Sequence, residues 1–62
     1  MGGMTPSEAI RILLEQGRTE AEVAAAVGLN QSSINRIKRE VSDPTYQVGK
    51  RLIEMARRKR AA

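Results

Sequence analysis

The sequence predicts an all-α fold, a compact domain of four or five short helices. Two observations predict it: apolar residues recur at intervals of three and four, and a residue able to cap a helix precedes each apolar run. Because Tyr46 is the one aromatic residue, the core has to be aliphatic. The 62 residues are close to the lower size limit for a chain that folds alone. We place the domain at residues 5–58, between an N-terminal segment, 1–4, and a basic C-terminal tail, 59–62.

The first helix is expected at residues 6–16. Thr5 and Glu8 can form a capping box, in which each side chain accepts a hydrogen bond from the other residue's backbone. Pro6 suits the first helical position because the N–H that it lacks would be unpaired there. Gly17 can adopt the left-handed backbone that ends a helix. The apolar stripe between these signals consists of Ile10, Leu13 and Leu14.

A pair of helices follows, at residues 20–27 and about 31–41. Thr19 and Glu22 form a second capping box at its start. Gly28 can take the positive φ that reverses the chain between the two helices. The inward-facing positions of the pair are Val23, Ala24, Val27, Leu29, Ile34, Ile37 and Val41. Two helices joined by a short turn containing Gly form a helix-turn-helix.

The last helix is expected to begin at Pro44, with Asp43 as its cap. Gly49 lies inside it, where Gly costs about 1 kcal/mol relative to Ala. It is either a point of close packing or a kink that splits the segment into a short turn and a longer helix. The apolar stripe consists of Val48, Leu52, Met55 and Ala56, with Tyr46 and Ile53 beside it.

The composition argues against catalysis, metal binding and membrane insertion. The chain has no Cys and no His, which excludes disulfides, a cysteine nucleophile and the usual zinc sites. Its carboxylates form no evident acid–base pair, so we expect no enzyme, cofactor or small-molecule ligand. No apolar run approaches the roughly 20 residues that span a bilayer. A second Met, at position 4, suggests that Met1 to Gly3 were added to the natural chain.

Positive charge is concentrated in the second half of the chain. Residues 1–30 hold two basic and four acidic side chains, whereas residues 31–62 hold nine basic and three acidic ones. The excess begins with the second helix of the pair, whose outward face is Ser32, Asn35, Arg36 and Arg39. Hydroxyl, amide and guanidinium groups of this kind hydrogen-bond to base edges and phosphates, so the sequence predicts a polyanion as partner.

The run from Gly28 to Ile34 resembles the turn and the start of the recognition helix in the phage repressor and Cro family. Ala24 and the buried positions of the pair also match that family. The resemblance implies a domain whose recognition helix, about 31–41 here, enters the major groove of DNA. It also implies that Gln31, Ser32, Asn35 and Arg36 read bases and that Asn30, Ser33, Lys38 and Arg39 contact phosphates.

Glu20 departs from the resembled family, in which several members have Gln at this position. A carboxylate there repels DNA phosphate, unless it pairs with a cation such as Arg36 or only serves the helix dipole. For the basic segment from Arg57 to Arg60, phosphate neutralisation and a role in solubility are equally open.

These features predict a transcriptional repressor of Cro type that excludes RNA polymerase from a promoter, in the cytoplasm of a bacterial host. The resemblance implies a homodimer on a pseudo-palindromic operator, and we expect dimerisation through the last helix and the tail. Three alternatives stay open: an antitoxin-type or other small helix-turn-helix regulator, a basic helical module that binds an acidic protein surface, and a basic peptide at a membrane surface.

Overall fold

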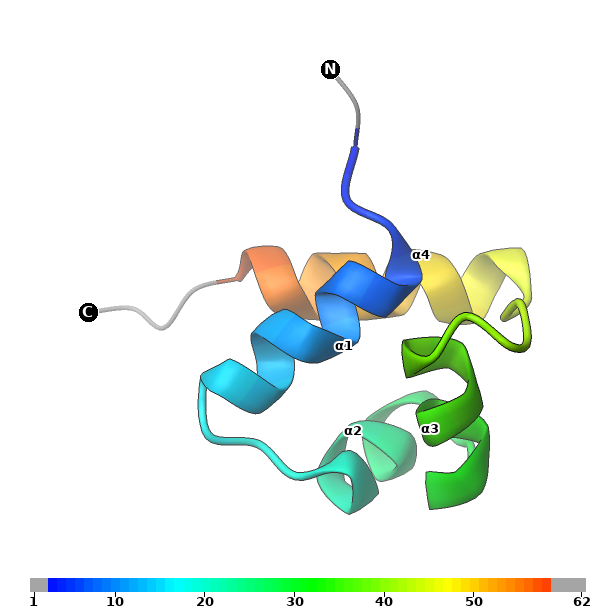
Figure 1. The fold of residues 1–62 in the computed structure, drawn as a ribbon. Coiled ribbons are helices and arrows are strands. Elements are labelled where there is room, and N and C mark those ends of the chain that lie inside the picture. Colours follow the sequence, from blue (N-terminus) through cyan, green and yellow to red (C-terminus); the bar gives the residue numbers. More distant parts are fainter. Residues whose placement is uncertain (1–2, 59–62) are drawn as a thin grey trace.

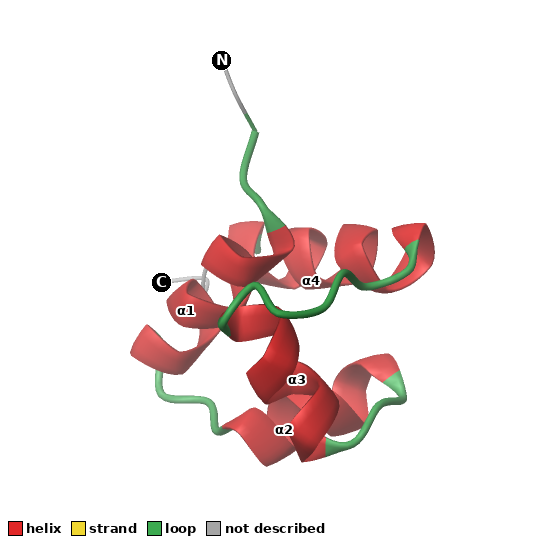
Figure 2. Ribbon diagram, turned by 45° about the vertical axis from the view of Figure 1, so that its right-hand side comes forward, coloured by secondary structure: helices red, strands yellow, loops and turns green. Residues whose placement is uncertain are grey.

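Four helices make up the part of the chain that the structure, a computed structural model, describes, residues 3–58 (Figure 1). The helices are α1 (Pro6–Glu15), α2 (Glu20–Val27), α3 (Gln31–Lys38) and α4 (Tyr46–Arg57). In two views α1 and α4 lie together, with α2 and α3 on one side of them (Figure 2). The all-α prediction is confirmed, with α2 and α3 as its central helix-turn-helix. Met1, Gly2 and the tail at 59–62 lie outside the described residues.

The core is aliphatic, and α1 contributes much of it, because it packs extensively against both α4 and α3. Burial of such side chains stabilises a domain by about 1.5–3 kcal/mol each, and this is the main force holding so short a chain together. The five largest fully buried side chains are Ile10, Leu13, Val23, Ile34 and Leu52.

Gly49 allows α4 to lie close to the start of α1. A Cβ atom at this position would be 3.3 Å from Cγ of Pro6, which is tighter than ordinary contact. The helix runs through Gly49 without interruption. Of the two interpretations of this glycine, close packing is therefore confirmed, and the kink that would have made a fifth helix is wrong.

Both capping boxes form as the sequence predicts. The hydroxyls of Thr5 and Thr19 accept hydrogen bonds from the backbone N–H groups of Glu8 and Glu22, each at 3.1 Å. In return, the carboxylates of both glutamates accept hydrogen bonds from the backbone N–H groups of the two threonines. Gly28 has φ +76°, which lets Leu29 N–H donate to Ala24 carbonyl at 2.9 Å and so ends α2. The end of α2 is thereby fixed by backbone hydrogen bonds.

Helix α3 ends at Lys38, so the prediction that it continues to Val41 is wrong. The reason is a left-handed residue, Glu40 with φ +63°, after which Val41 N–H donates to Arg36 carbonyl at 2.9 Å. This bond closes the helix in the way that a C-terminal glycine usually does. Val41 consequently leaves the inward face, and its side chain is 68% exposed.

Helix α4 begins at Tyr46 rather than at Pro44. The cap is Thr45, whose hydroxyl accepts a hydrogen bond from Val48 N–H at 3.2 Å, so the prediction of Asp43 as the cap is also wrong. A threonine three residues before a free amide has the correct spacing for a cap, whereas Asp43 lies two residues too early.

Candidate nucleic-acid interface

The N-terminus of α3 is capped by a neutral side chain. Asn30 has extended backbone (φ −99°, ψ 169°), and its Oδ1 accepts hydrogen bonds from Ser33 N–H at 2.9 Å and from Ser32 Oγ at 3.0 Å. The first turn of α3 holds no acidic residue. Because the first amides of a helix carry partial positive charge, this end is suited to an anion such as phosphate.

The surface of α3 divides into a covered side and an open side. Ile34 and Ile37 are buried against the core. Ser33, Asn35 and Lys38 are partly buried. The exposed residues at the helix and its two ends are Asn30, Gln31, Ser32, Arg36 and Arg39. Three of the four predicted base-reading residues are thus exposed, and the fourth, Asn35, is partly buried at the edge of the open side.

Glu20, the first residue of α2, contacts two residues of α3 at the edge of its open side. Its Oε2 accepts a hydrogen bond from Lys38 Nζ at 2.7 Å and a long one from Asn35 Nδ2 at 3.5 Å. The hydrogen bond from Lys38 is the largest cause of a lowered pKa at Glu20, with smaller contributions from Asn35 and Gln31, while partial burial acts in the opposite direction. The carboxylate is therefore ionised and neutralised inside the domain.

The partner of Glu20 differs from the cation that the sequence suggested. Arg36 is exposed and Lys38 makes the ion pair. Lys38 lies four residues after the buried Ile34, which places it next to the inward face, whereas Arg36 lies two residues after Ile34 and points elsewhere. The prediction that Glu20 pairs with Arg36 is thus wrong, and Arg36 forms no ion pair among the described residues.

A known family matches this arrangement. A helix-turn-helix family model covers residues 8–58, which is most of the chain. The chain belongs to the helix-turn-helix family, of the Cro and phage repressor type. Family members bind double-stranded DNA as regulators and are not typically enzymes. No curated protein and no solved structure matches the chain.

One residue that supports the helix-turn-helix was missed in the sequence. Ser7, in the first turn of α1, is 5% exposed, and its Oγ donates to the carbonyl of Lys38 at 2.9 Å. The bond satisfies a carbonyl at the C-terminus of α3, where helix carbonyls lack partners. Its spacing of three residues from the buried Ile10 is the signal that could have revealed it.

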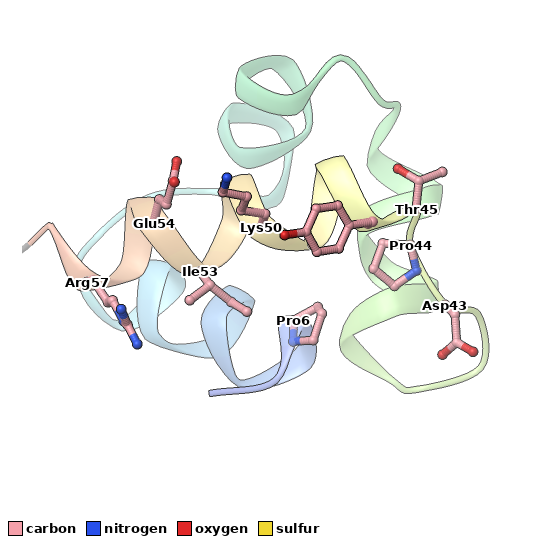
Figure 3. Close-up of a pocket in the computed structure, with 10 residues that line it drawn as sticks. Pro6, Asp43, Pro44, Thr45, Lys50, Ile53, Glu54 and Arg57 are labelled. Atoms are coloured by element: carbon pink, nitrogen blue, oxygen red, sulfur yellow. The ribbon is translucent and has the colours of Figure 1, made fainter. Parts of the chain in front are cut away.

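An apolar groove of about 520 Å³ lies along α4, beside the start of α1 (Figure 3). Pro6, Pro44 and Ile53 form part of its wall. Tyr46, at the start of α4, also lines the groove and is 80% exposed. Charges of both signs border it, namely Asp43, Lys50, Glu54 and Arg57.

Residues 3–58 contain no cluster of His, Cys, Asp and Glu that could hold a metal ion. Within the same part of the chain, no helix has the length and apolar character needed to cross a bilayer.

Proposed function

We propose that this helix-turn-helix domain is a sequence-specific repressor of Cro type, acting in the cytoplasm of a bacterial cell. The observation that carries the proposal is the open side of α3, where exposed Gln31 and Ser32 follow a helix start without acidic residues and Arg36 is exposed in the last turn. An α-helix fits the major groove, and side chains near the N-terminus of a recognition helix reach base edges there. Occupation of a promoter by the domain would exclude RNA polymerase.

Arg36 is the strongest candidate for base reading, because it is exposed and free of intrachain ion pairs among the described residues. Its guanidinium matches O6 and N7 of guanine in a bidentate contact. Asn30, Ser33 and Arg39 are proposed to contact phosphates. Lys38 belongs to the same proposal, although its ammonium would have to be shared with Glu20, 2.7 Å away.

A homodimer on a pseudo-palindromic operator is part of the proposal, since helix-turn-helix dimers place two recognition helices about 34 Å apart. The groove along α4 is the surface we assign to the second copy. A two-fold interface has to be self-complementary. This groove combines a protruding ring, Tyr46, with apolar walls and both Lys50 and Glu54 at its edge.

The test of the proposed function is selection of bound sequences from a random duplex library at about 0.15 M salt, a physiological ionic strength. Enrichment of an inverted repeat with centres about 10 base pairs apart supports both the repressor and the dimer. Enrichment of a single half-site supports base reading and rejects the dimer. Retention without enrichment, lost as the salt concentration rises, rejects the repressor, and retention of no duplex favours a protein-interaction module.

The dimer is tested separately by sedimentation equilibrium of wild type and Tyr46→Ala. Because Tyr46 is 80% exposed, its truncation should not unfold the monomer. We expect dimerisation to be weakened at least tenfold, which corresponds to about 1.4 kcal/mol for a truncated interface aromatic. Equal self-association of both proteins would reject this interface.

A further inference from the structure

Two of the four proposed base-reading side chains already donate hydrogen bonds to other residues of the domain. Ser32 donates from Oγ to Asn30 Oδ1 at 3.0 Å, and Asn35 donates from Nδ2 towards Glu20 Oε2 at 3.5 Å. A serine hydroxyl carries a single proton. While this bond persists, Ser32 can therefore meet a ligand only as an acceptor.

Glu20 decides which end of the Asn35 amide is available. An ionised carboxylate only accepts hydrogen bonds, so the nitrogen of Asn35 has to face it and the oxygen has to face away. Lys38 keeps Glu20 ionised through the 2.7 Å ion pair. No hydrogen bond within residues 3–58 reaches Oδ1 of Asn35, which leaves this oxygen as an acceptor at the border of the open side.

We propose that Glu20 is a positioning residue that fixes a donor and acceptor order on α3, with acceptors at Ser32 and Asn35 and donors at Arg36. The inference rests on the proposed function, in which this side of α3 reads bases. In the major groove the exocyclic amines of cytosine and adenine donate, while guanine O6 and N7 accept. The operator therefore presents cytosine or adenine to Asn35 and guanine to Arg36.

The same ion pair removes the conflict between an acidic residue at the start of α2 and a DNA ligand. Glu20 is 19% exposed and Lys38 is 28% exposed in their side chains, so both charges are partly withdrawn from the surface. A neutralised carboxylate repels phosphate less than a free one does. Glu20 thus organises the readout instead of opposing the DNA.

The test is random duplex selection with wild type, Asn35→Ala and Glu20→Ala. Asn35→Ala identifies the base pair that Asn35 reads, because only that preference is lost. Lys38 and Asn35 both donate to Oε2 of Glu20, so Glu20→Ala removes the acceptor that orients the Asn35 amide, and either end of the amide can then face the DNA. At the identified base pair we expect the preference for cytosine or adenine over guanine or thymine to fall by roughly tenfold.

Glu22→Gln is the matched control. It removes the same charge from the same helix end, but Glu22 accepts from the Thr19 backbone and not from α3. We expect this variant to select the wild-type sequence. A second variant, Asn35→Asp, can only accept at this position and should keep the cytosine or adenine preference without any change at Glu20.

Three results would overturn the inference. They are unchanged base selection by folded Glu20→Ala, a uniform loss of affinity for all sequences, and reversal of the preference by Asn35→Asp. Circular dichroism establishes whether each variant is folded, and if Glu20→Ala is not, Asn35→Asp decides. If wild type itself enriches no sequence, the proposed function fails first, and that outcome is distinct from a failure of the Glu20 inference.

Discussion

Helices α2 and α3 start with almost the same geometry and opposite electrostatics. Their caps, Thr19 and Asn30, have φ and ψ of −99° and 165° and of −99° and 169°. Each cap accepts a hydrogen bond from the backbone N–H three residues on, at 3.1 and 2.9 Å. Yet α2 has Glu20 and Glu22 in its first turn, and the first turn of α3 has no acid.

The difference shows that helix geometry does not by itself make an anion site. At α2 the positive end of the helix is already matched by carboxylates of the chain, which favours folding. At α3 no acidic residue of the first turn matches the corresponding charge. This contrast supports the proposal that the second helix of the motif, and not the first, meets DNA.

The largest expected effect comes from removing the guanidinium on the open side of α3. Arg36→Ala should lose roughly 10- to 100-fold of discrimination at one base pair, because a bidentate guanine contact disappears. Arg18→Ala removes an equal charge just before α2 and should weaken binding to all sequences alike. Competition binding with duplexes that differ at single positions measures both. Equal behaviour of the two variants would contradict base reading by Arg36.

A second change gives α3 the acidic start of α2. Ser33→Glu completes a capping box with Asn30, so thermal stability should rise slightly, by a few tenths of a kcal/mol. DNA affinity should fall about tenfold, because a carboxylate then occupies the anion site at this end. Gln16→Glu, at the end of α1, controls for the change in net charge. Unchanged affinity in Ser33→Glu would show that the start of α3 does not meet phosphate.

The C-termini of the same two helices offer a further contrast, since the left-handed residue that follows α2 is Gly28, whereas the one that follows α3 is a glutamate, Glu40. Glu40→Gly should stabilise the domain by about 1 kcal/mol, because glycine adopts positive φ without the steric cost of a Cβ atom. For a domain of this size that corresponds to about 4–8 °C in melting temperature. Glu40→Ala keeps the Cβ and should give no such gain in urea unfolding. A gain of equal size in both would assign the effect to charge.

The smallest effect concerns the pH dependence contributed by Glu20. Its pKa is lowered below 4.5 in the folded protein. The unfolded chain therefore binds the proton of Glu20 more readily than the folded protein does. The stabilisation that the ionised Glu20 provides is complete above pH 4.5 and is lost as the pH falls through the lowered pKa. The difference in unfolding free energy between wild type and Glu20→Gln should stay below about 1 kcal/mol at pH 7 and shrink towards pH 3. A difference that grew on acidification would contradict the ion pair.

Local signals predicted the starts of α1, α2 and α3 correctly, whereas at α4 the local spacing also fitted Thr45 and Asp43 was predicted instead. The capping boxes at Thr5 and Thr19 need only residues three apart, and Gly28 needs only its own backbone freedom. The aliphatic stripes on α1, α2 and α3 likewise follow from helical spacing. The family and the all-α fold could be inferred from these features.

The other errors arose where a distant contact or an unusual backbone decides the outcome. Glu40 adopts the left-handed conformation that is usually found at glycine, so the local sequence did not predict the end of α3. Whether Lys38 or Arg36 would face Glu20 depended on how α3 crosses α2. The bond from Ser7 to the end of α3 joins residues 31 apart in the chain. The roles of the exposed α3 residues toward DNA remain predictions, because a ligand has to be present to test them.

The most direct test of the central claim is an NMR titration of ¹⁵N-labelled protein with a duplex recovered by selection. We expect the largest amide shifts at residues 30–36, with smaller ones at the start of α2. The groove along α4 should respond less to a single half-site than to a full operator. Shifts concentrated along that groove with a half-site, and an unaffected α3, would contradict the assignment of α3 as the recognition helix.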